Sequence, residues 1–103
     1  MSLEDVDLEA GILSDLQKLA AKFHLKLIIF GSRADGTASD VSDVDLAVKG
    51  YGSPMVRADF EEAVKNLPVL LMFDIVDYDS ILVSDVLRKE IDEKGILLYQ
   101  NTF

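Results

Sequence analysis

The sequence predicts an α/β fold in which helices pack on a mixed sheet of about four strands. Helical and strand-like segments alternate along the chain, which is the pattern of layered α/β proteins. The 103 residues are half hydrophobic, so they suffice for one domain with one hydrophobic core. No repeat, linker or low-complexity segment interrupts the alternation. We therefore expect a single domain over residues 1–103.

The first half of the chain predicts a helix, a strand, a turn and a second strand. Apolar residues three and four positions apart predict an amphipathic helix over residues 6–23. Residues 25–30 form an apolar run without helical polarity, which predicts a strand buried on both faces. Residues 31–42 are small and polar and predict a turn that contains one short helix. Residues 43–49 alternate enough to form the second strand.

The second half of the chain predicts two further helices, each followed by a strand. The Ser-Pro pair at 53–54 is typical of an N-cap and a first helical position, so a helix is expected to about residue 66. Residues 69–76 have the strongest strand pattern. Ser80 is expected to cap another helix, and residues 96–99 to form the last strand. The buried face of that helix is expected to carry Ile81, Leu82, Val86, Leu87 and Ile91.

Composition and charge argue against several classes of protein. The net charge of −9 opposes broad binding to nucleic-acid backbones, which depends on clustered Lys and Arg. No apolar run approaches the roughly 20 residues that a transmembrane helix needs, and the acidic start lacks the basic residues of a signal peptide. The absence of Cys excludes disulfides and thiolate metal sites. We expect a cytoplasmic protein without membrane contact.

Asp43, Asp45 and Asp74 are the candidate metal ligands and catalytic residues. Asp43 and Asp45 lie two positions apart on a predicted strand, so their side chains point to one face. Asp74 lies inside a later strand, from which it can point toward a neighbouring strand. Two unit charges about 4 Å apart repel by about 4 kcal/mol at an effective dielectric of about 20. Converging carboxylates therefore indicate a cation between them.

The ligand types favour particular metal ions. Oxygen ligands without His or Cys favour Mg²⁺ or Mn²⁺. Three carboxylates can hold two such ions at the spacing used for an in-line phosphoryl displacement. An Asp-x-Asp pair alone is weak evidence, because the chain has thirteen aspartates and such residues also serve in loops and caps.

Gly31, Ser32 and Arg33 directly follow the first predicted strand and are the candidate phosphate-binding residues. Gly31 lets the backbone approach a ligand closely, and Ser32 offers a hydroxyl and an N–H. A short helix that begins near Ser32 would direct its first N–H groups at the same place. Arg33 either reaches the phosphates or pairs with a surface acid. If Gly31 and Asp43 share one site, the first two strands must run antiparallel, which makes the sheet mixed.

These stretches resemble the minimal nucleotidyltransferases of the DNA polymerase beta superfamily. The matching segments are 30–34 (Phe-Gly-Ser-Arg-Ala), 42–46 (Ser-Asp-Val-Asp-Leu) and 73–77 (Phe-Asp-Ile-Val-Asp), and residues 91–99 resemble the family's end. The resemblance implies a polymerase beta-like nucleotidyltransferase fold. It also implies Mg²⁺-dependent transfer of a nucleoside monophosphate, expected to be AMP from ATP, to an acceptor with release of pyrophosphate.

The resemblance also implies roles for individual residues. Gly31 and Ser32 would hold the phosphates, and Asp43 and Asp45 would bind both metal ions. Asp74 would complete one metal site and help to deprotonate the acceptor. The family commonly has a basic or aromatic residue where this chain has Asp35, and an acid beside a triphosphate weakens binding unless it turns to solvent.

The size of the chain implies a partner, because larger members use a further helical domain to grip the base and the acceptor. Members of this size resemble antitoxins paired with a small helical HEPN-domain protein, in homo- or hetero-oligomers. Two functions stay open, namely nucleotidyl transfer to such a partner and masking of the partner without catalysis. A calcium-binding loop over residues 40–45 lacks the closing Glu of an EF-hand, and a receiver-like domain fits the strand position of the acids poorly.

Overall fold

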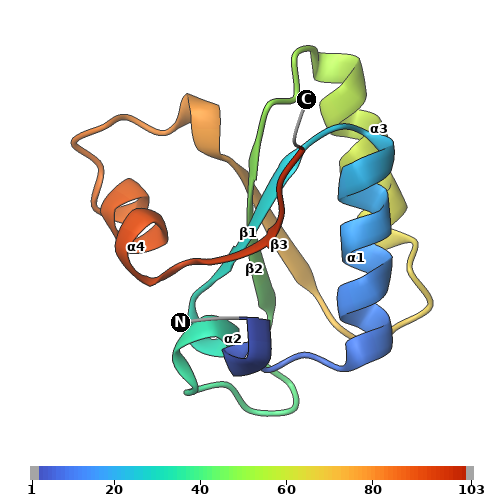
Figure 1. Cartoon of the computed structure of the whole chain (residues 1–103), viewed down its shortest axis with the longest axis vertical. Coiled ribbons are helices and arrows are strands. Elements are labelled where there is room, and N and C mark those ends of the chain that lie inside the picture. The colour runs from blue at the N-terminus through green and yellow to red at the C-terminus, as the bar shows by residue number, and fades with distance from the viewer. Residues whose placement is uncertain (1–2, 102–103) are drawn as a thin grey trace.

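Four strands form one sheet that lies between helices (Figure 1). The computed structural model describes residues 3–101, and it confirms the predicted order of elements with two short 3-10 helices added. Within this part of the chain, no helix combines the length and the apolar character needed to cross a bilayer. The helices are η1 (Leu3–Asp5), α1 (Ala10–Lys22), α2 (Ser32–Asp35), α3 (Pro54–Lys65), η2 (Tyr78–Ser80) and α4 (Val86–Lys94), and the strands are β1 (Lys26–Phe30), β2 (Val44–Lys49), β3 (Phe73–Asp77) and β4 (Ile96–Tyr99).

The sheet is mixed and has the strand order β3-β2-β1-β4. β1 is antiparallel to both of its neighbours, whereas β2 and β3 are parallel. The predicted antiparallel pairing of the first two strands is thereby confirmed. Phe30 at the end of β1 is the register partner of Asp45 near the start of β2. Gly31 and Asp43 therefore lie at the same end of the sheet, as a shared site requires.

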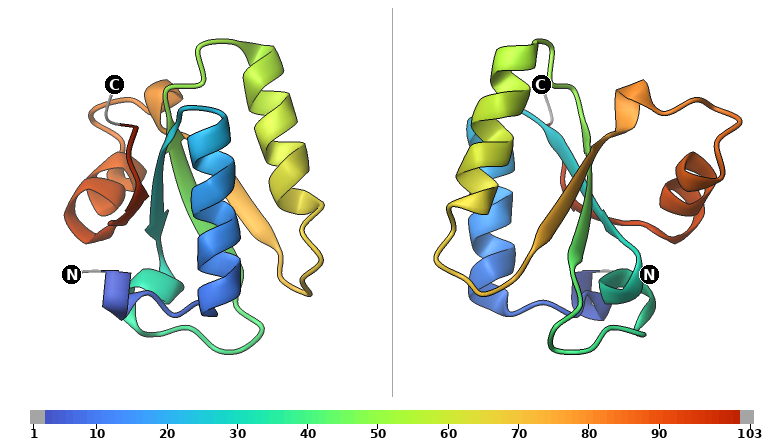
Figure 2. Two further views of the ribbon diagram at one scale, coloured as in Figure 1. Left: turned by 45° about the vertical axis from the view of Figure 1, so that its right-hand side comes forward. Right: turned by 180° about the vertical axis from the view of Figure 1, so that it is seen from behind.

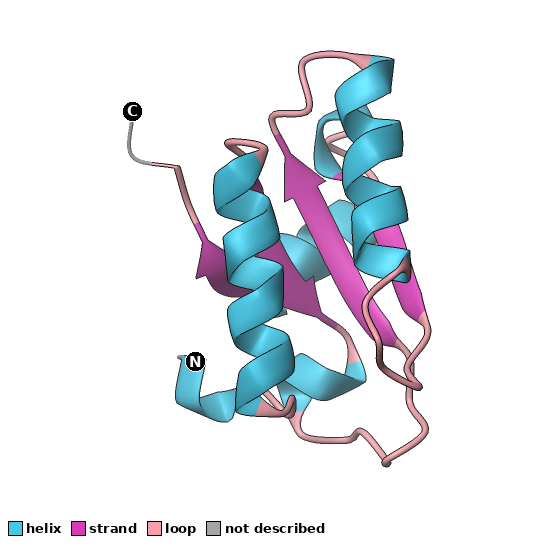
Figure 3. Cartoon of the chain, turned by 90° about the vertical axis from the view of Figure 1, so that its right-hand side faces the viewer, coloured by secondary structure: helices cyan, strands magenta, loops and turns pink. Residues whose placement is uncertain are grey.

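The two faces of the sheet are covered unequally (Figures 1 and 2). α1 and α3 lie side by side on one face, and Figure 3 shows both helices in front of the strands. The main core lies between them and the sheet, around fully buried Leu16, Leu46 and Phe60. α4 covers the other face, where Ile91 packs with Phe30 and Ala47 in a smaller cluster. Residues of β2 thus alternate between the two faces, as strand geometry requires.

α1 starts at Ala10, four residues later than predicted. The backbone N–H of Asp7 donates to the carbonyl of Arg33 at 2.8 Å, and Arg33 Nη1 donates to the carbonyl of Asp7 at 2.9 Å. These bonds hold the segment before the helix against α2. Glu9 is the N-cap residue with extended ψ of 139° and no side-chain cap bond. A tertiary contact therefore overrides the local helical pattern of residues 6–9.

β3 starts at Phe73, although an apolar strand was predicted from residue 69. Its partner β2 begins at Val44, which is the register partner of Phe73. Residues before Phe73 therefore have no strand beside them to pair with, and one last bond joins Val44 N–H to the carbonyl of Met72 at 2.9 Å. Leu70 is fully exposed in this bend-rich segment.

α4 also starts later than predicted, at Val86 instead of after Ser80. Ser80 ends η2 instead, and its hydroxyl donates to Asp77 Oδ2 at 2.8 Å. The cap of α4 is Asp85, whose Oδ1 accepts from the N–H of Leu87 at 2.9 Å. Of the five residues expected on the buried face, Leu82 and Val86 are exposed, while Ile91 is buried as predicted.

The position after α4 requires glycine because there is no room for a side chain, and not because of its backbone dihedral angles. Gly95 has φ −68° and ψ 150°, which any residue adopts, and its N–H donates to the carbonyl of Ile91 at 2.9 Å. A Cβ at this position would overlap both the Ile91 carbonyl and Ile28 Cγ2. The turn from α4 into β4 is therefore packed too closely for a side chain.

Replacement of Gly95 by alanine should lower the free energy of unfolding by about 1–3 kcal/mol, because the added methyl group overpacks the turn. Gly11 in α1 is the matched control, since a Cβ there meets nothing within 4 Å. Gly11→Ala should be neutral or should stabilise by up to about 1 kcal/mol through helix propensity. Urea denaturation followed by circular dichroism measures both variants, and equal effects would contradict the packing argument.

Candidate active site

Asp45 and Asp74 lie side by side on neighbouring strands. They are register partners in the parallel pair of β2 and β3, whose backbones are about 4.8 Å apart in such sheets. Aligned residues of a parallel pair point to the same face. Val44 and Leu46 pack into the core under α1 and α3, so the intervening Asp45 points to the face that carries α4. The structure therefore brings two of the three predicted ligands together.

Asp43 completes the predicted group from the residue before β2. It has the same strand parity as Asp45 and is exposed. Burial raises the pKa of Asp45 above the ordinary value of 3.8, and the charges of Asp74, Asp43 and Glu90 raise it further. Both other predicted acids are thus near enough to act on Asp45. Across residues 3–101, Asp43, Asp45 and Asp74 form no ion pair and accept no side-chain hydrogen bond.

Glu90 is an acid at this site that the sequence did not reveal. It lies on α4, three residues after Leu87 and beside Ile91, both of which pack in the cluster under this helix. Residues three apart share a helix face, so Glu90 is turned toward the sheet near Asp45. The sequence alone did not single out Glu90, because it can be assigned to the site only when the contact face of α4 is known.

Gly31 closes the site against Asp45. Its φ of 74° and ψ of −153° lie in a region that only glycine adopts readily. A Cβ on Gly31 would overlap Asp45 Oδ2, so the backbone of the turn lies directly against this carboxylate. The predicted neighbourhood of the Gly-Ser turn and the Asp-x-Asp pair is present in the structure.

These residues suit a divalent cation because of their ligand atoms and because the carboxylates and the Gly31 turn lie close together. The group offers only carboxylate oxygens, the ligands that Mg²⁺ and Mn²⁺ prefer, and a backbone turn that lies on one of them. In residues 3–101, however, no three acidic or His side chains are gathered tightly enough to form a metal cluster as they stand. Carboxylates without a cation between them repel, so the side chains would have to turn inward to bind one.

Ser32 and Asp35 belong to α2, the short helix predicted in this turn. Ser32 is its first residue, is partly buried and makes no side-chain hydrogen bond to the described residues. The Asp35 carboxylate turns away into its own loop, where Thr37 N and Oγ1 donate to Oδ1 at 3.0 and 2.5 Å. These bonds lower the pKa of Asp35, chiefly through the Thr37 hydroxyl. The acid that breaks the family pattern is thus exposed and directed at Thr37.

Arg33 does not point at the carboxylates. It is 6% exposed, and Nε and Nη2 donate to the Ser42 carbonyl at 3.1 and 2.9 Å. Nη2 also lies 3.4 Å from the carbonyls of Ser39 and Asp40, and Nη1 reaches Asp7. These contacts match neither the predicted phosphate contact nor pairing with a surface acid. Arg33 instead fixes the loop whose last peptide precedes Asp43.

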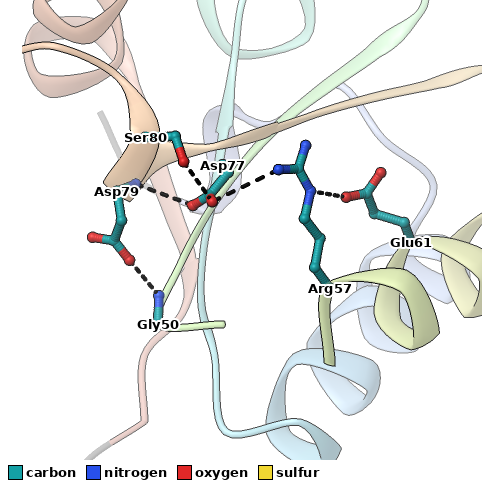
Figure 4. A network of polar contacts seen from close by, with 6 residues as sticks. All are labelled: Gly50, Arg57, Glu61, Asp77, Asp79 and Ser80. Atoms are coloured by element: carbon teal, nitrogen blue, oxygen red, sulfur yellow. Dashed lines mark hydrogen bonds and ion pairs between the residues drawn. The ribbon is translucent and has the colours of Figure 1, made fainter. Parts of the chain in front are cut away.

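A second polar group lies at the other ends of β2 and β3 (Figure 4). Arg57 lies 2.7 Å from Glu61 and 3.8 Å from Asp77, and Asp79 Oδ2 accepts from Gly50 N–H at 2.9 Å. It borders a hollow of about 370 Å³ that also reaches Tyr51. Both aspartates already have partners there, so this group ties loops to α3 and lacks the unpaired acids of the candidate site.

Comparison with known proteins decides the family. The protein-family model described as "Polymerase beta, Nucleotidyltransferase" matches residues 14–103 of the chain. The chain belongs to the polymerase beta nucleotidyltransferase family. The predicted resemblance and the predicted fold are confirmed. No curated protein matches this nucleotidyltransferase domain.

Two solved structures resemble this nucleotidyltransferase domain. One is described as a toxin–antitoxin with AMP-PNP; it is 24% identical, has a TM-score of 0.66, and the match covers 87% of this chain and 74% of that chain. The other is a mutant of the toxin–antitoxin MntA–HpeT in which two aspartates two positions apart are replaced by glutamate; it is 22% identical with a TM-score of 0.65 and the same coverage. At these identities the likeness shows the fold alone.

Replacement of Gly31 by alanine should destabilise the nucleotidyltransferase domain by about 2 kcal/mol or more, through backbone strain and the overlap with Asp45. Gly36→Ala, also at a positive φ but with open space around it, should cost only about 1–2 kcal/mol. In an Asp45→Ala background the cost of Gly31→Ala should shrink by about 0.5 kcal/mol or more. Additive effects in this denaturant-measured cycle would show that the two residues do not touch.

Asp45→Asn should make the domain more stable at neutral pH. The folded protein binds the Asp45 proton more tightly than the unfolded chain, so stability falls as pH rises through 3.8 toward the raised pKa and stays lower above it. The gain is small because solvent still reaches and screens this half-buried carboxylate. Thermal melting of both proteins at about pH 7 and about pH 3 tests this; the asparagine variant should lose its advantage at the acid pH.

Proposed function

We propose that this chain is a Mg²⁺-dependent nucleotidyltransferase that moves a nucleoside monophosphate, AMP from ATP, to a hydroxyl of a protein partner in a toxin–antitoxin pair. The observation that carries the proposal is the pairing of Asp45 with Asp74 beneath Gly31, in a member of the polymerase beta nucleotidyltransferase family. Unpaired acids next to a glycine turn are costly for a fold, and a bound cation with a triphosphate would relieve that cost.

Each residue has a distinct task in this proposal. Asp43 and Asp45 would hold two Mg²⁺ ions, and Asp74 would complete one of the two sites. The bound ions supply charge neutralisation on the triphosphate and the leaving group. The backbone of Gly31 and the free hydroxyl of Ser32 would hold the phosphates. Arg33 keeps the peptide before Asp43 in place and so positions these ligands.

The reaction would be an in-line displacement at the α-phosphorus. The acceptor hydroxyl oxygen forms a bond to that phosphorus, and the bond from the α-phosphorus to the bridging oxygen of the β-phosphate breaks. Pyrophosphate leaves with that bonding electron pair, and the hydroxyl proton passes to the Asp74 carboxylate. Positioning and charge neutralisation provide most of the rate gain in such chemistry.

The solved neighbours support the nucleotide and the kind of assembly. One is a toxin–antitoxin described with the ATP analogue AMP-PNP, and the other carries glutamate for aspartate at two positions two residues apart. That spacing is the spacing of Asp43 and Asp45 in this chain. The proposed partner is a small helical HEPN-type protein, which would supply a wall for the base and the acceptor.

A second function is masking of such a partner by a subunit that no longer catalyses. The observation that favours it is the absence of a ready three-carboxylate cluster within residues 3–101. The two functions differ in their need for Asp43 and Asp45, which transfer requires and masking does not.

The deciding experiment incubates the chain with Mg²⁺, α-labelled ATP, CTP, GTP or UTP, and the protein encoded by the adjacent gene. We expect label on that protein, with ATP as the best donor. Asp43→Asn and Asp45→Asn should each lower the transfer on the order of a hundredfold or more. Asp59→Asn, on the exposed face of α3, is the matched control and should transfer normally.

Metal binding gives a readout independent of turnover. Millimolar Mg²⁺ should raise the melting temperature of the wild type and of Asp59→Asn, but not of Asp43→Asn or Asp45→Asn. A complex that forms without any label transfer, and that both asparagine variants still form, would decide for the masking function.

A further inference from the structure

An open hollow beside α1 is lined by aliphatic side chains. Its volume is about 600 Å³, and its walls come from the start of α1, the loop before β2 and the bend-rich segment before β3. Val41 and Leu70 line it and are 88% and 106% exposed. The two loops lie at the end of the sheet where β2 and β3 begin (Figure 2). Aliphatic side chains this exposed are costly in water unless a partner covers them.

The rim of the hollow is acidic and its acids are unpaired. Asp7 and Glu9 stand on one wall and Asp40 on another. None of the three side chains makes an ion pair with a described residue. Arg33 also lines the hollow, but it is buried and its guanidinium is directed at backbone carbonyls. The three acids outnumber the one guanidinium, so the rim presents net negative charge around an apolar centre.

The apolar centre and the acidic rim indicate which kind of partner segment the hollow can bind. A second copy of this chain would bring its own net charge of −9 against the acidic rim. An added strand needs a free sheet edge, whereas these walls are a helix start, a loop and a bend-rich segment. A helix with an aliphatic stripe between Lys and Arg residues satisfies both the apolar centre and the acidic rim.

We propose that this hollow docks a basic amphipathic helix of a partner protein, with aliphatic side chains on Val41 and Leu70 and Lys or Arg side chains at Asp7, Glu9 and Asp40. Val41 lies two residues before Asp43 on the same loop. Arg33 bonds that loop and the Asp7 carbonyl together, so the docked helix rests on the structure that holds the candidate site. Docking does not require nucleotide, metal or catalysis.

The test uses a synthetic helical peptide of about 18 residues, long enough to form a helix, with a leucine stripe flanked by lysines. Two control peptides replace every lysine by glutamate or every leucine by serine. Amide chemical-shift mapping on the isotope-labelled full chain, without nucleotide, should place the basic peptide at Val41 and Leu70. The two control peptides should bind at least about tenfold more weakly, and added salt should weaken the basic peptide further.

Matched variants locate the contact. Val41→Ser and Leu70→Ser should each weaken binding about tenfold, and Asp40→Asn should reduce its salt dependence. Leu82→Ser and Val83→Ser, on another exposed aliphatic stretch, should leave binding unchanged. Thermal melting checks that each variant folds, as expected for exposed positions.

Several results would overturn the docking proposal. They are equal binding of the lysine and glutamate peptides, shifts confined to Leu82 and Val83, self-association of the chain that Leu70→Ser abolishes, and absence of binding. Because the peptide assay contains neither nucleotide nor Mg²⁺, it can fail while label transfer succeeds, and the reverse. The outcome for docking is therefore separate from the outcome for catalysis.

Discussion

The parallel register of β2 and β3 is the constraint on which the candidate site depends. Backbone hydrogen bonding aligns Asp45 with Asp74, and the carboxylates must stay close although they repel. The same register buries Val44, Leu46 and Val48 under α1 and α3. A slip by one residue would exchange the two faces of β2. Burial of the apolar residues on one face therefore enforces the acidic group on the other, and the fold tolerates a local cost at the place where a cation would be useful.

The position of Asp43 depends on the buried side chain of Arg33, which does not contact the carboxylates itself. The guanidinium of Arg33 collects carbonyls from the N-terminal segment and from the loop before β2. Carbonyl partners satisfy its donors without neutralising any of the acids. This arrangement explains how a loop rich in small polar residues can hold Asp43 next to β2. It also shows how a residue in the predicted phosphate-binding segment can hold the neighbouring backbone in place instead of contacting a ligand.

Most of the fold was predictable because its signals are local. Apolar periodicity predicted α1, a short apolar run predicted β1, and the Ser-Pro pair predicted the start of α3. The condition that Gly31 and Asp43 share one site predicted the antiparallel pairing. The late starts of α1 and β3 were not predictable, because distant partners set them: Arg33 for the first and the beginning of β2 for the second. α4 starts late because Asp85 caps it, while Ser80 bonds to Asp77 in η2. The roles of Arg33 and Glu90 were hidden for the same reason, since only the packed structure shows which way they point.

Several unpaired acidic side chains of the chain lie at one end of the sheet. A net charge of −9 by itself opposes broad binding to nucleic acid, but it does not say where on the molecule the charge lies. In the structure, the unpaired carboxylates of Asp43, Asp45 and Asp74 lie at the end of the sheet that also carries the acidic rim of the hollow. Arg33 lies among them, but its donors are directed at carbonyls and it is shielded from solvent. The acids at this end outnumber the single positive charge of Arg33, so approaching cations meet a net negative field to which the rim and the site both contribute. A divalent ion at the carboxylates and a basic helix in the hollow would bind at separate places. Each would lower the negative potential that attracts the other, so binding of one would weaken the electrostatic attraction of the other.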